Sequence, residues 1–219
     1  MWSKQLRRFA ALLLSLALLL ALPALGAGNR PVLSLRIGGE EHEAYLHGYD
    51  DGSFRPNGFI TRAEEAQMLY NLLEERPAER AALEDVQESD WYYDALGLLA
   101  AAGVVTPYDN GCIAPNAQLT RAQFVIMLVN LFPELPEGQC SYTDLTEYAP
   151  WYGAVAKATA AGWVNGYEDG TFRAAERVTR AEAATIINRA LGRSADRETL
   201  DRELVIPLYT DLGPDHWAY

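Results

Sequence analysis

Apolar residues recur with the period of an amphipathic helix just ahead of two glycine-bearing loops. In both segments they fall at i, i+4, i+7 and i+11, which is one face of a helix. They are Trp91, Ala95, Leu98 and Ala102 in one segment, and Trp151, Val155, Ala158 and Gly162 in the other. Gly103 and Gly162 stand at the ends, where a left-handed residue closes a helix at little cost. The pattern predicts two helices that each end at a glycine.

A second helix is predicted after each loop. Thr-Arg-Ala-Glu or Thr-Arg-Ala-Gln at a helix start is a capping box, and it occurs at Thr61, Thr120 and Thr179 with a constant spacing of 59 residues. Loop tyrosines keep the same spacing, at Tyr49, Tyr108 and Tyr167. Self-similarity at a fixed period indicates a repeat protein. We therefore predict a mainly α fold of three helix–loop–helix repeats.

The first repeat and the C-terminal tail are incomplete in complementary ways. We divide the chain into a leader at 1–26, repeats at 30–76, 84–133 and 142–195, and a linker at 196–219 that begins a further repeat-like helix. Residues 33–39 replace the first helix of repeat one, and their alternation and paired glycines predict a short strand or hairpin. The tail repeats the Tyr-Thr-Asp-Leu of 142–145 at 209–212. Because it starts the helix that repeat one lacks, we expect residues 209–219 to pack on residues 30–73 and close a ring.

The N-terminus indicates export. Lys4, Arg7 and Arg8 precede an apolar run over 9–22 and then small residues, which is the order of a secretory signal peptide cleaved after Gly26. An uncleaved anchor is the alternative, although the run is at the short limit for spanning a bilayer. Cleavage removes three positive charges and takes the net charge from −12 to −15. Such an acidic secreted chain is expected to bind neither nucleic acid nor, after cleavage, membrane.

One arginine follows the capping threonine in every repeat, at Arg62, Arg121 and Arg180. A cation in the first helical turn opposes the helix dipole, so the capping box does not account for it. Two explanations stay open. The arginine pairs with an aspartate or glutamate of this acidic chain, or it joins the free N–H groups of the helix start in binding a carboxylate or phosphate.

These motifs carry a family resemblance. Trp-Tyr-Tyr in the first helix, Gly-Tyr-Glu-Asp-Gly-Thr-Phe-Arg in the loop and Val-Thr-Arg-Ala-Glu-Ala-Ala opening the second helix resemble the S-layer homology domain. The resemblance implies a pseudo-threefold assembly at the cell surface, in the S-layer. In that family, grooves between repeats bind secondary cell-wall polysaccharide, often pyruvylated. Carried over by position, the implied ligand-binding residues are Arg62, Arg121, Arg180, Asp51, Gly52, Asp169, Gly170, Trp91, Trp151 and Trp217.

Repeat two departs from the family pattern. Pro107 replaces the loop glycine, Asn110 the aspartate, Ala114 an arginine and Gln123 the glutamate. Its arginine is kept, while these four positions of its loop and second helix differ. We expect its groove to be the weakest of the three.

Other functions are less well supported by the residues. The three histidines are scattered and no nucleophile, phosphate-loop or metalloprotease motif occurs, so we predict no catalytic residue and no cofactor. The loop aspartates lack the spacing of a calcium site, so we predict no metal. Cys112 and Cys140 leave one disulfide open. The alternative function is a secreted protein–protein assembly module without glycan binding. Self-association of the chain would be consistent with that alternative.

Overall fold

The computed structural model describes residues 35–37, 44–193 and 209–213. Every described residue belongs to one compact unit, within residues 33–219. The predicted signal peptide at 1–26 and Trp217 lie outside the described residues. Of the helices that are described, none has the length and apolar character needed to cross a bilayer.

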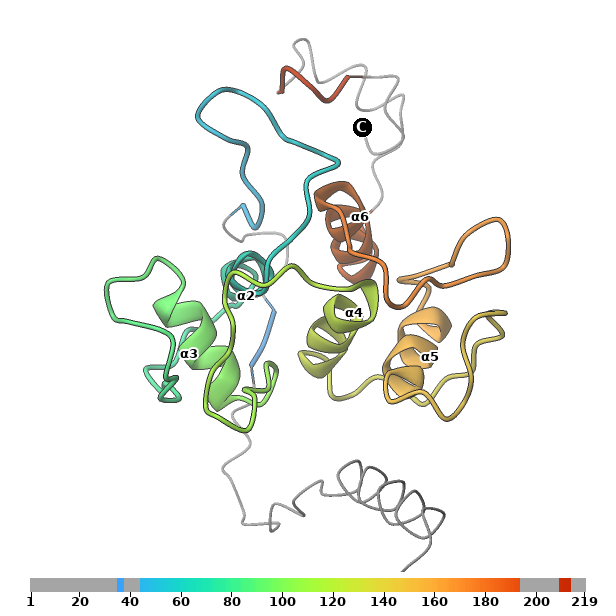
Figure 1. Ribbon diagram of the computed structural model, residues 1–219, viewed down its shortest axis with the longest axis horizontal. Helices are drawn as coiled ribbons and strands as arrows, with labels where there is room; N and C mark the ends of the chain where they lie inside the picture. The colour runs from blue at the N-terminus through green and yellow to red at the C-terminus, as the bar shows by residue number, and fades with distance from the viewer. Residues whose placement is uncertain (1–34, 38–43, 194–208, 214–219) are drawn as a thin grey trace, which may run out of the picture. The chain divides into compact units, whose positions relative to one another are not determined.

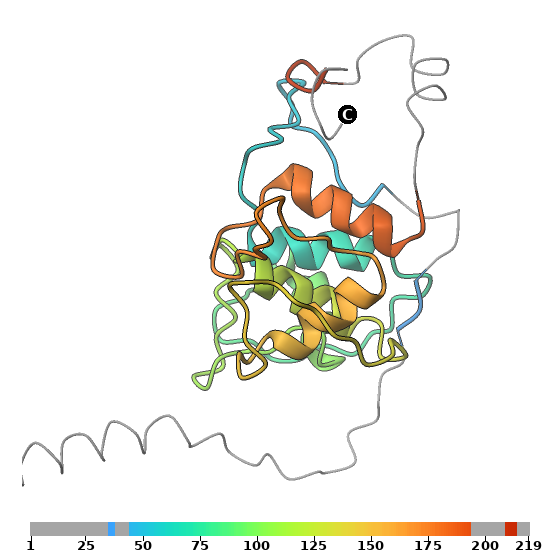
Figure 2. The ribbon, with the colours of Figure 1, turned by 90° about the vertical axis from the view of Figure 1, so that its right-hand side faces the viewer.

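The described part of the chain contains helices of two kinds. Three follow the loops, namely α2 (Arg62–Asn71), α4 (Arg121–Asn130) and α6 (Arg180–Ala190), and two precede them, namely α3 (Tyr93–Ala101) and α5 (Tyr152–Ala160). Figure 1 shows α2, α4 and α6 around a common centre, with α3 and α5 outside them, and Figure 2 shows the same helices from the side. The predicted mainly α fold with three repeats is confirmed.

The local sequence signals place the helix ends correctly. In α2 the Thr61 side chain accepts a hydrogen bond from the N–H of Glu64, and the Glu64 carboxylate accepts one from the N–H of Thr61. The equivalent capping boxes occur at the starts of α4 and α6. Gly103 and Gly162, just past α3 and α5, have φ of +76° and +75°. Both predictions are confirmed.

We call α2, α4 and α6 the inner helices, and α3 and α5 the outer helices. The residues just before the three inner helices are joined by backbone hydrogen bonds in a closed cycle. The N–H of Ile60 donates to Val178, that of Val178 to Leu119, and that of Leu119 back to Ile60, over 3.1, 3.2 and 2.9 Å. All three side chains are fully buried. One residue from each repeat therefore holds one residue of the next, and the expected three-repeat ring is present.

The first N–H groups of each inner helix also find partners in a neighbouring loop. Such groups have no partner within their own helix. They donate to loop carbonyls of another repeat, in the pairs Arg62–Ala117, Ala63–Pro115, Arg121–Glu176, Ala122–Ala174, Arg180–Gly58 and Ala181–Pro56. The loops thus cap the helices of their neighbours, which makes the repeats interdependent.

In repeats two and three, an aspartate that precedes α3 or α5 accepts hydrogen bonds from the loop of its own repeat. The two oxygens of Asp85 accept from the N–H groups of Ile113 and Ala114, each at 2.7 Å. Asp144 binds Phe172 and Arg173 in the same way. We call this arrangement the aspartate clamp. In each pair the second residue has a positive φ, 51° and 61°, which costs a non-glycine residue about 1–2 kcal/mol. The clamp supports this unfavourable backbone.

In repeat one the clamp comes from the C-terminal tail. Asp211 accepts from the N–H groups of Phe54 and Arg55 at 2.6 and 2.8 Å, and Arg55 has φ of 57°. The N–H of Thr210 donates to Gly52, and the ring of Tyr209 lies 5.1 Å from that of Phe54. Figures 1 and 2 both show residues 209–213 beside the loop of repeat one. The expected contact between tail and first repeat is confirmed.

Only part of the predicted strand or hairpin at 33–39 falls within the described residues. There Ile37 forms an isolated antiparallel bridge with Leu73, and the N–H of Glu74 donates to Arg36. Residues 33, 34, 38 and 39 lie outside the described part. Cys112 and Cys140 are free thiols, so the disulfide left open by the sequence is not formed.

A carboxyl group interrupts the apolar core. Glu65 of α2 occupies the position that Phe124 takes in α4 and Ala183 in α6, and it is completely buried. Neither of its oxygens has a hydrogen-bond partner within the described residues. Burial raises the pKa of Glu65 well above its usual value, although the charge of Arg62 opposes the shift. The core therefore favours a neutral carboxylic acid.

Glu65→Leu should stabilise the protein in a pH-dependent manner. An acid whose pKa is raised in the fold costs little below its ordinary pKa and more as pH rises. Urea unfolding should therefore show a gain of about 1–3 kcal/mol at pH 7, from removal of an unsatisfied buried group, and a smaller gain at pH 4. Glu65→Gln, which has the same shape and does not ionise, should match the wild type at pH 4 and exceed it at pH 7. Equal gains at both pH values would contradict this account.

Candidate functional site

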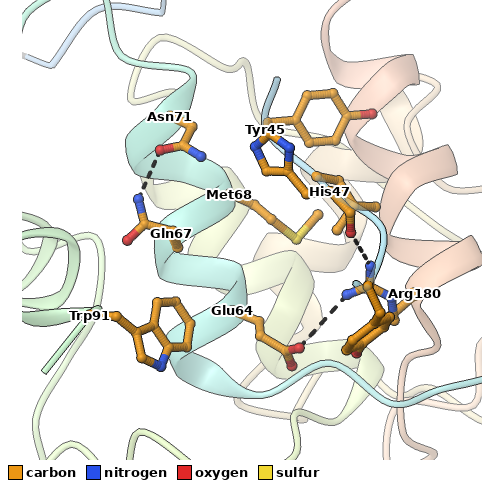
Figure 3. Close-up of a pocket in the computed structure, with 10 residues that line it drawn as sticks. Tyr45, His47, Glu64, Gln67, Met68, Asn71, Trp91 and Arg180 are labelled. Atoms are coloured by element: carbon orange, nitrogen blue, oxygen red, sulfur yellow. Dashed lines mark hydrogen bonds and ion pairs between the residues drawn. The ribbon is translucent and has the colours of Figure 1, made fainter. Parts of the chain in front are cut away.

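A hollow of about 220 Å³ lies where the three repeats meet. Residues 45–49 and α2 of repeat one form most of its wall, Trp91 of repeat two lies at one side, and Arg180 of repeat three at the other (Figure 3). The lining residues are Tyr45, Leu46, His47, Tyr49, Glu64, Gln67, Met68, Asn71, Trp91 and Arg180. The site exists only when the ring is assembled.

Arg180 is held firmly in the wall of the hollow. Its Nε donates to the carbonyl of Phe54 at 2.8 Å and its Nη2 to that of His47 at 2.7 Å, while Nη1 lies 3.7 Å from the carboxylate of Glu64. The guanidinium also lies 4.8 Å from the ring centre of Tyr49. Two hydrogen bonds use two of the five N–H donors of an arginine. Because Nη1 and the carboxylate of Glu64 are 3.7 Å apart, an anion in the hollow could replace Glu64 as the partner of Nη1.

An exposed aromatic side chain and two amides complete the hollow. Trp91 is 62% exposed, although it packs edge-on against Tyr92 at 5.1 Å. On α2 the side chain of Gln67 donates to that of Asn71 at 2.8 Å (Figure 3). An aromatic face with neighbouring amide and guanidinium groups can bind a ligand that has both an apolar face and polar edges. A sugar ring is such a ligand.

Residues at three equivalent positions come together in every repeat, and we call each such set an arginine site. It consists of a loop tyrosine, the third helix residue of that repeat and the arginine of the preceding repeat in the cycle. The first site is Tyr49, Glu64 and Arg180, the second is Tyr108, Gln123 and Arg62, and the third is Tyr167, Glu182 and Arg121. The arginines lie 4.8, 5.6 and 5.1 Å from their tyrosine ring centres.

The third arginine site is neutralised internally. Nη1 of Arg121 donates to Glu182 at 3.2 Å, and the hydroxyl of Tyr167 donates to the same carboxylate at 2.6 Å. Burial and the hydrogen bond to Glu182 raise the pKa of Tyr167 to about 12. Burial alone would raise the pKa of Glu182, but the bond from Tyr167, the N–H of Thr179 and the charge of Arg121 lower it. The carboxylate is thus charged and committed to Arg121.

The second arginine site lacks a carboxylate. Gln123 occupies the position of Glu64 and Glu182, and no ion pair to Arg62 occurs within the described residues. Nη2 of Arg62 donates to the carbonyl of Thr106 at 3.2 Å. Its buried Nε, like that of Arg121, has no hydrogen-bond partner within the described residues, so the missing carboxylate is what distinguishes Arg62. Arg62 therefore carries the least compensated charge of the three arginines.

The structure brings together some of the predicted site residues and separates others. Arg180 and Trp91 line the same hollow. Asp51 accepts bonds from Ser53 and Arg55 within its own exposed turn, and Asp169 does the same from Thr171 and Arg173. Hydrogen bonds from the side chain and N–H of the serine or threonine lower the pKa of both aspartates to about 2. Neither aspartate lines the hollow.

The remaining predicted residues have structural surroundings. Gly52 and Gly170 follow those aspartates at φ of +77° and +79°, as their turns require. Trp151 packs against the core, and its buried Nε1 has no partner within the described residues. The ligand-binding roles assigned to these residues by resemblance stay predictions.

The contacts of the arginines bear on the two explanations left open by the sequence. The N–H groups at the helix starts are already bonded to loop carbonyls, so they are not free for an anion. Arg121 and Arg180 both have a glutamate partner from another repeat. Pairing therefore accounts for the position of these two arginines, and it does not account for Arg62.

Several residues of the hollow were not singled out by the motifs. Glu64, Gln67 and Asn71 fall at i, i+3 and i+7 on α2, a polar stripe that was visible in the sequence. Tyr49 was found as a landmark of the repeat without a role. His47 contributes through its backbone carbonyl, so its side-chain type gave no signal.

Comparisons with known proteins agree with this architecture. A model of the S-layer homology domain matches residues 42–65, 82–125 and 141–184. The first match is the shortest, because repeat one lacks the segment ahead of its loop. The chain therefore belongs to the S-layer homology domain family, as the motifs suggested.

Several similar proteins have names that place them at a cell surface or in a surface layer. The chain is 32% identical over 199 residues to Cell surface glycoprotein 1 of Acetivibrio thermocellus, covering 84% of this chain and 8% of that protein. It is 29% identical over 189 residues to the Cellulosome-anchoring protein of the same organism, covering 82% and 41%. It is 33% identical over 125 residues to the Surface-layer 125 kDa protein of Lysinibacillus sphaericus, covering 56% and 11%. The chain spans less than half the length of each relative.

The family sets the general character of the chain. The matched domain family and the anchoring and surface-layer relatives support a role in anchoring at the cell wall. The family and its surface-layer relatives also confirm the expected location at the cell surface. They say nothing of which groups on the chain make contact with the wall.

Gln123→Glu should stabilise the protein by giving Arg62 the carboxylate that the other two arginines have. A charge-assisted contact in a partly buried site is worth about 1–2 kcal/mol. Urea unfolding at pH 7 should show this gain, and the gain should disappear as the introduced carboxylate is protonated near pH 4. Glu182→Gln is the matched control and should destabilise, because it leaves Arg121 uncompensated. No gain from Gln123→Glu would show that Arg62 is already compensated.

Proposed function

We propose that this chain is a non-covalent anchor that binds secondary cell-wall polysaccharide in the hollow between its repeats. The observation that carries the proposal is the exposed indole of Trp91 opposite the guanidinium of Arg180, in a site built by three repeats. A mostly exposed tryptophan contributes little to the core, so its position in the hollow is best explained by a ligand. The family and its relatives support wall anchoring in general.

The chemistry of the hollow suits an acidic sugar. The apolar face of a pyranose would lie on Trp91, its hydroxyl groups would reach Gln67 and Asn71, and a carboxylate such as a ketal-linked pyruvate would pair with Arg180. The Nη1 group and Glu64 are 3.7 Å apart, so a bidentate ligand can replace this contact. The volume of about 220 Å³ is below the roughly 300–1,000 Å³ of ordinary ligand pockets. It fits a short stretch of a polymer.

The three arginine sites are not equivalent toward an anion. The sequence predicted the weakest binding at repeat two, because its loop departs from the family pattern. The charges favour the reverse for an anionic group, since Arg62 lacks a glutamate while Arg121 is paired at 3.2 Å. We therefore assign a second anion contact to Arg62. Two contacts on one polymer would add through effective concentration.

Trp91→Ala should weaken binding to purified cell-wall fragments about tenfold or more without unfolding the protein. Stacking on an aromatic side chain contributes on the order of 0.5–2 kcal/mol. Because Trp91 is mostly exposed, its loss should leave the melting temperature almost unchanged. Cosedimentation with wall fragments measures the change. Tyr148→Ala is the matched control, because Tyr148 is an aromatic residue that is 96% exposed and lies outside the hollow.

The same experiment separates the two candidate functions. Wall stripped of its polysaccharide should no longer sediment the wild-type protein. Equal sedimentation with stripped and intact wall would favour a protein assembly module instead. Undiminished binding by Trp91→Ala to intact wall would reject the hollow as the binding site.

A further inference from the structure

The tail replaces, contact by contact, a segment that repeat three has within its own sequence. In repeat three, Tyr142 packs 5.4 Å from Phe172, the N–H of Thr143 donates to Gly170, and Asp144 clamps the loop. In repeat one, Tyr209 packs against Phe54, the N–H of Thr210 donates to Gly52, and Asp211 clamps the loop. The clamp spans 28 and 29 residues in repeat three and 157 and 156 in repeat one. Repeat one is thus completed from the opposite end of the chain.

A glycine makes room for the tyrosine in both repeats. A Cβ atom built on Gly48 would collide with the ring of Tyr209, and one built on Gly166 would collide with the ring of Tyr142. These two glycines are equivalent positions of the repeat. The close approach of Tyr209 to the backbone at Gly48 is therefore a specific fit.

The residues that the tail holds are those that hold Arg180. Phe54 donates its N–H to Asp211 and accepts the Nε–H of Arg180 at its carbonyl, at 2.6 and 2.8 Å. His47, whose carbonyl accepts from Nη2 of Arg180, directly precedes Gly48 beneath Tyr209. One hydrogen bond of the guanidinium therefore ends on a residue that the tail binds, Phe54, and the other on the residue that precedes Gly48, which the tail contacts.

The geometry points to a positioning role for residues 209–211: the docked tail sets the loop of repeat one and thereby the orientation of Arg180 in the hollow. Asp211 is the principal positioning residue, because it satisfies two adjacent N–H groups and supports the positive φ of Arg55. Backbone N–H bonds to its carboxylate, that of Phe54 foremost, lower the pKa of Asp211, so it is charged at neutral pH. Glycan binding and tail docking are then coupled. The effect of the tail on glycan binding rests on the proposed function, whereas its effect on the orientation of Arg180 does not.

The test compares Asp211→Ala with Asp144→Ala in the full-length protein. Each variant removes one clamp, but only Asp211 is joined to Arg180 through Phe54. The side-chain Nε–H of Arg180 gives its own signal in a ¹H–¹⁵N NMR spectrum. We expect Asp211→Ala to shift or broaden this signal and to speed amide exchange at residues 47–55, while Asp144→Ala leaves both unchanged. Asp211→Asn, which keeps one acceptor oxygen, should lie between wild type and Asp211→Ala.

Gly48→Ala gives an independent perturbation that leaves the tail sequence intact. The added methyl group collides with the ring of Tyr209 and also comes within 3.0 Å of the carbonyl oxygen of Ser53. It should therefore change the Arg180 signal, and an unchanged signal is the decisive outcome. Gly153→Ala is the matched control, because a Cβ atom there meets nothing within 4 Å. If Asp211→Ala does not fold, this pair of variants decides the question.

The outcomes separate the coupling from the function. An unchanged Arg180 signal in Asp211→Ala or Gly48→Ala overturns the coupling, and so does an equal change in Asp144→Ala, which would indicate general loosening. Where the wild type sediments with cell-wall fragments, Asp211→Ala should bind at least tenfold more weakly than Asp144→Ala. A wild type that binds no wall rejects the proposed function, and the NMR comparison still decides the role of the tail.

Discussion

The cycle of backbone hydrogen bonds through Ile60, Leu119 and Val178 is the constraint on which the rest of the structure depends. Each repeat contributes one donor and one acceptor to it, and each loop caps the inner helix of a neighbour. No single repeat can satisfy the first two N–H groups of its own inner helix, because the carbonyl groups that accept them belong to another repeat. Buried N–H groups without partners are costly. The three repeats are therefore expected to fold as one cooperative unit, with the binding surface as a product of the closure.

This closure explains why a strongly acidic chain uses arginine at the boundaries between repeats. A guanidinium reaches across the boundary to a carbonyl or carboxylate of its neighbour and can still present donors to the hollow. Its planar array of donors serves several acceptors at once. The same residue can thus join two repeats and recognise a carboxylate. The three sites differ in how much of that capacity is already used, and Glu64, Gln123 and Glu182 set the difference.

Local features of the fold could be predicted from the sequence, and features that join distant residues mostly could not. The capping boxes and the glycines after α3 and α5 depend on neighbours within a few residues, so their motifs were sufficient. The pairing of Arg121 with Glu182 joins residues 61 apart, and nothing in either repeat alone shows it. The docking of the tail was an exception, because the repeated Tyr-Thr-Asp-Leu indicated which gap it fills. The amide of Gln67 was missed because it does not recur, since Ile126 and Thr185 take its place in the other repeats, and Asn71, which recurs at Asn130, lies at the helix end outside the capping and loop motifs.

The central claim is that the assembled ring places Trp91 and Arg180 around an acidic sugar. An NMR titration of the full-length protein with a monosaccharide that carries a pyruvate ketal tests it most directly, with the unsubstituted sugar as the reference. We expect saturable shifts of the Trp91 indole N–H with both sugars, and shifts of the Arg180 Nε–H with the pyruvylated sugar alone. Saturable shifts that leave both side chains unaffected, or an arginine response that is the same for the two sugars, would contradict it.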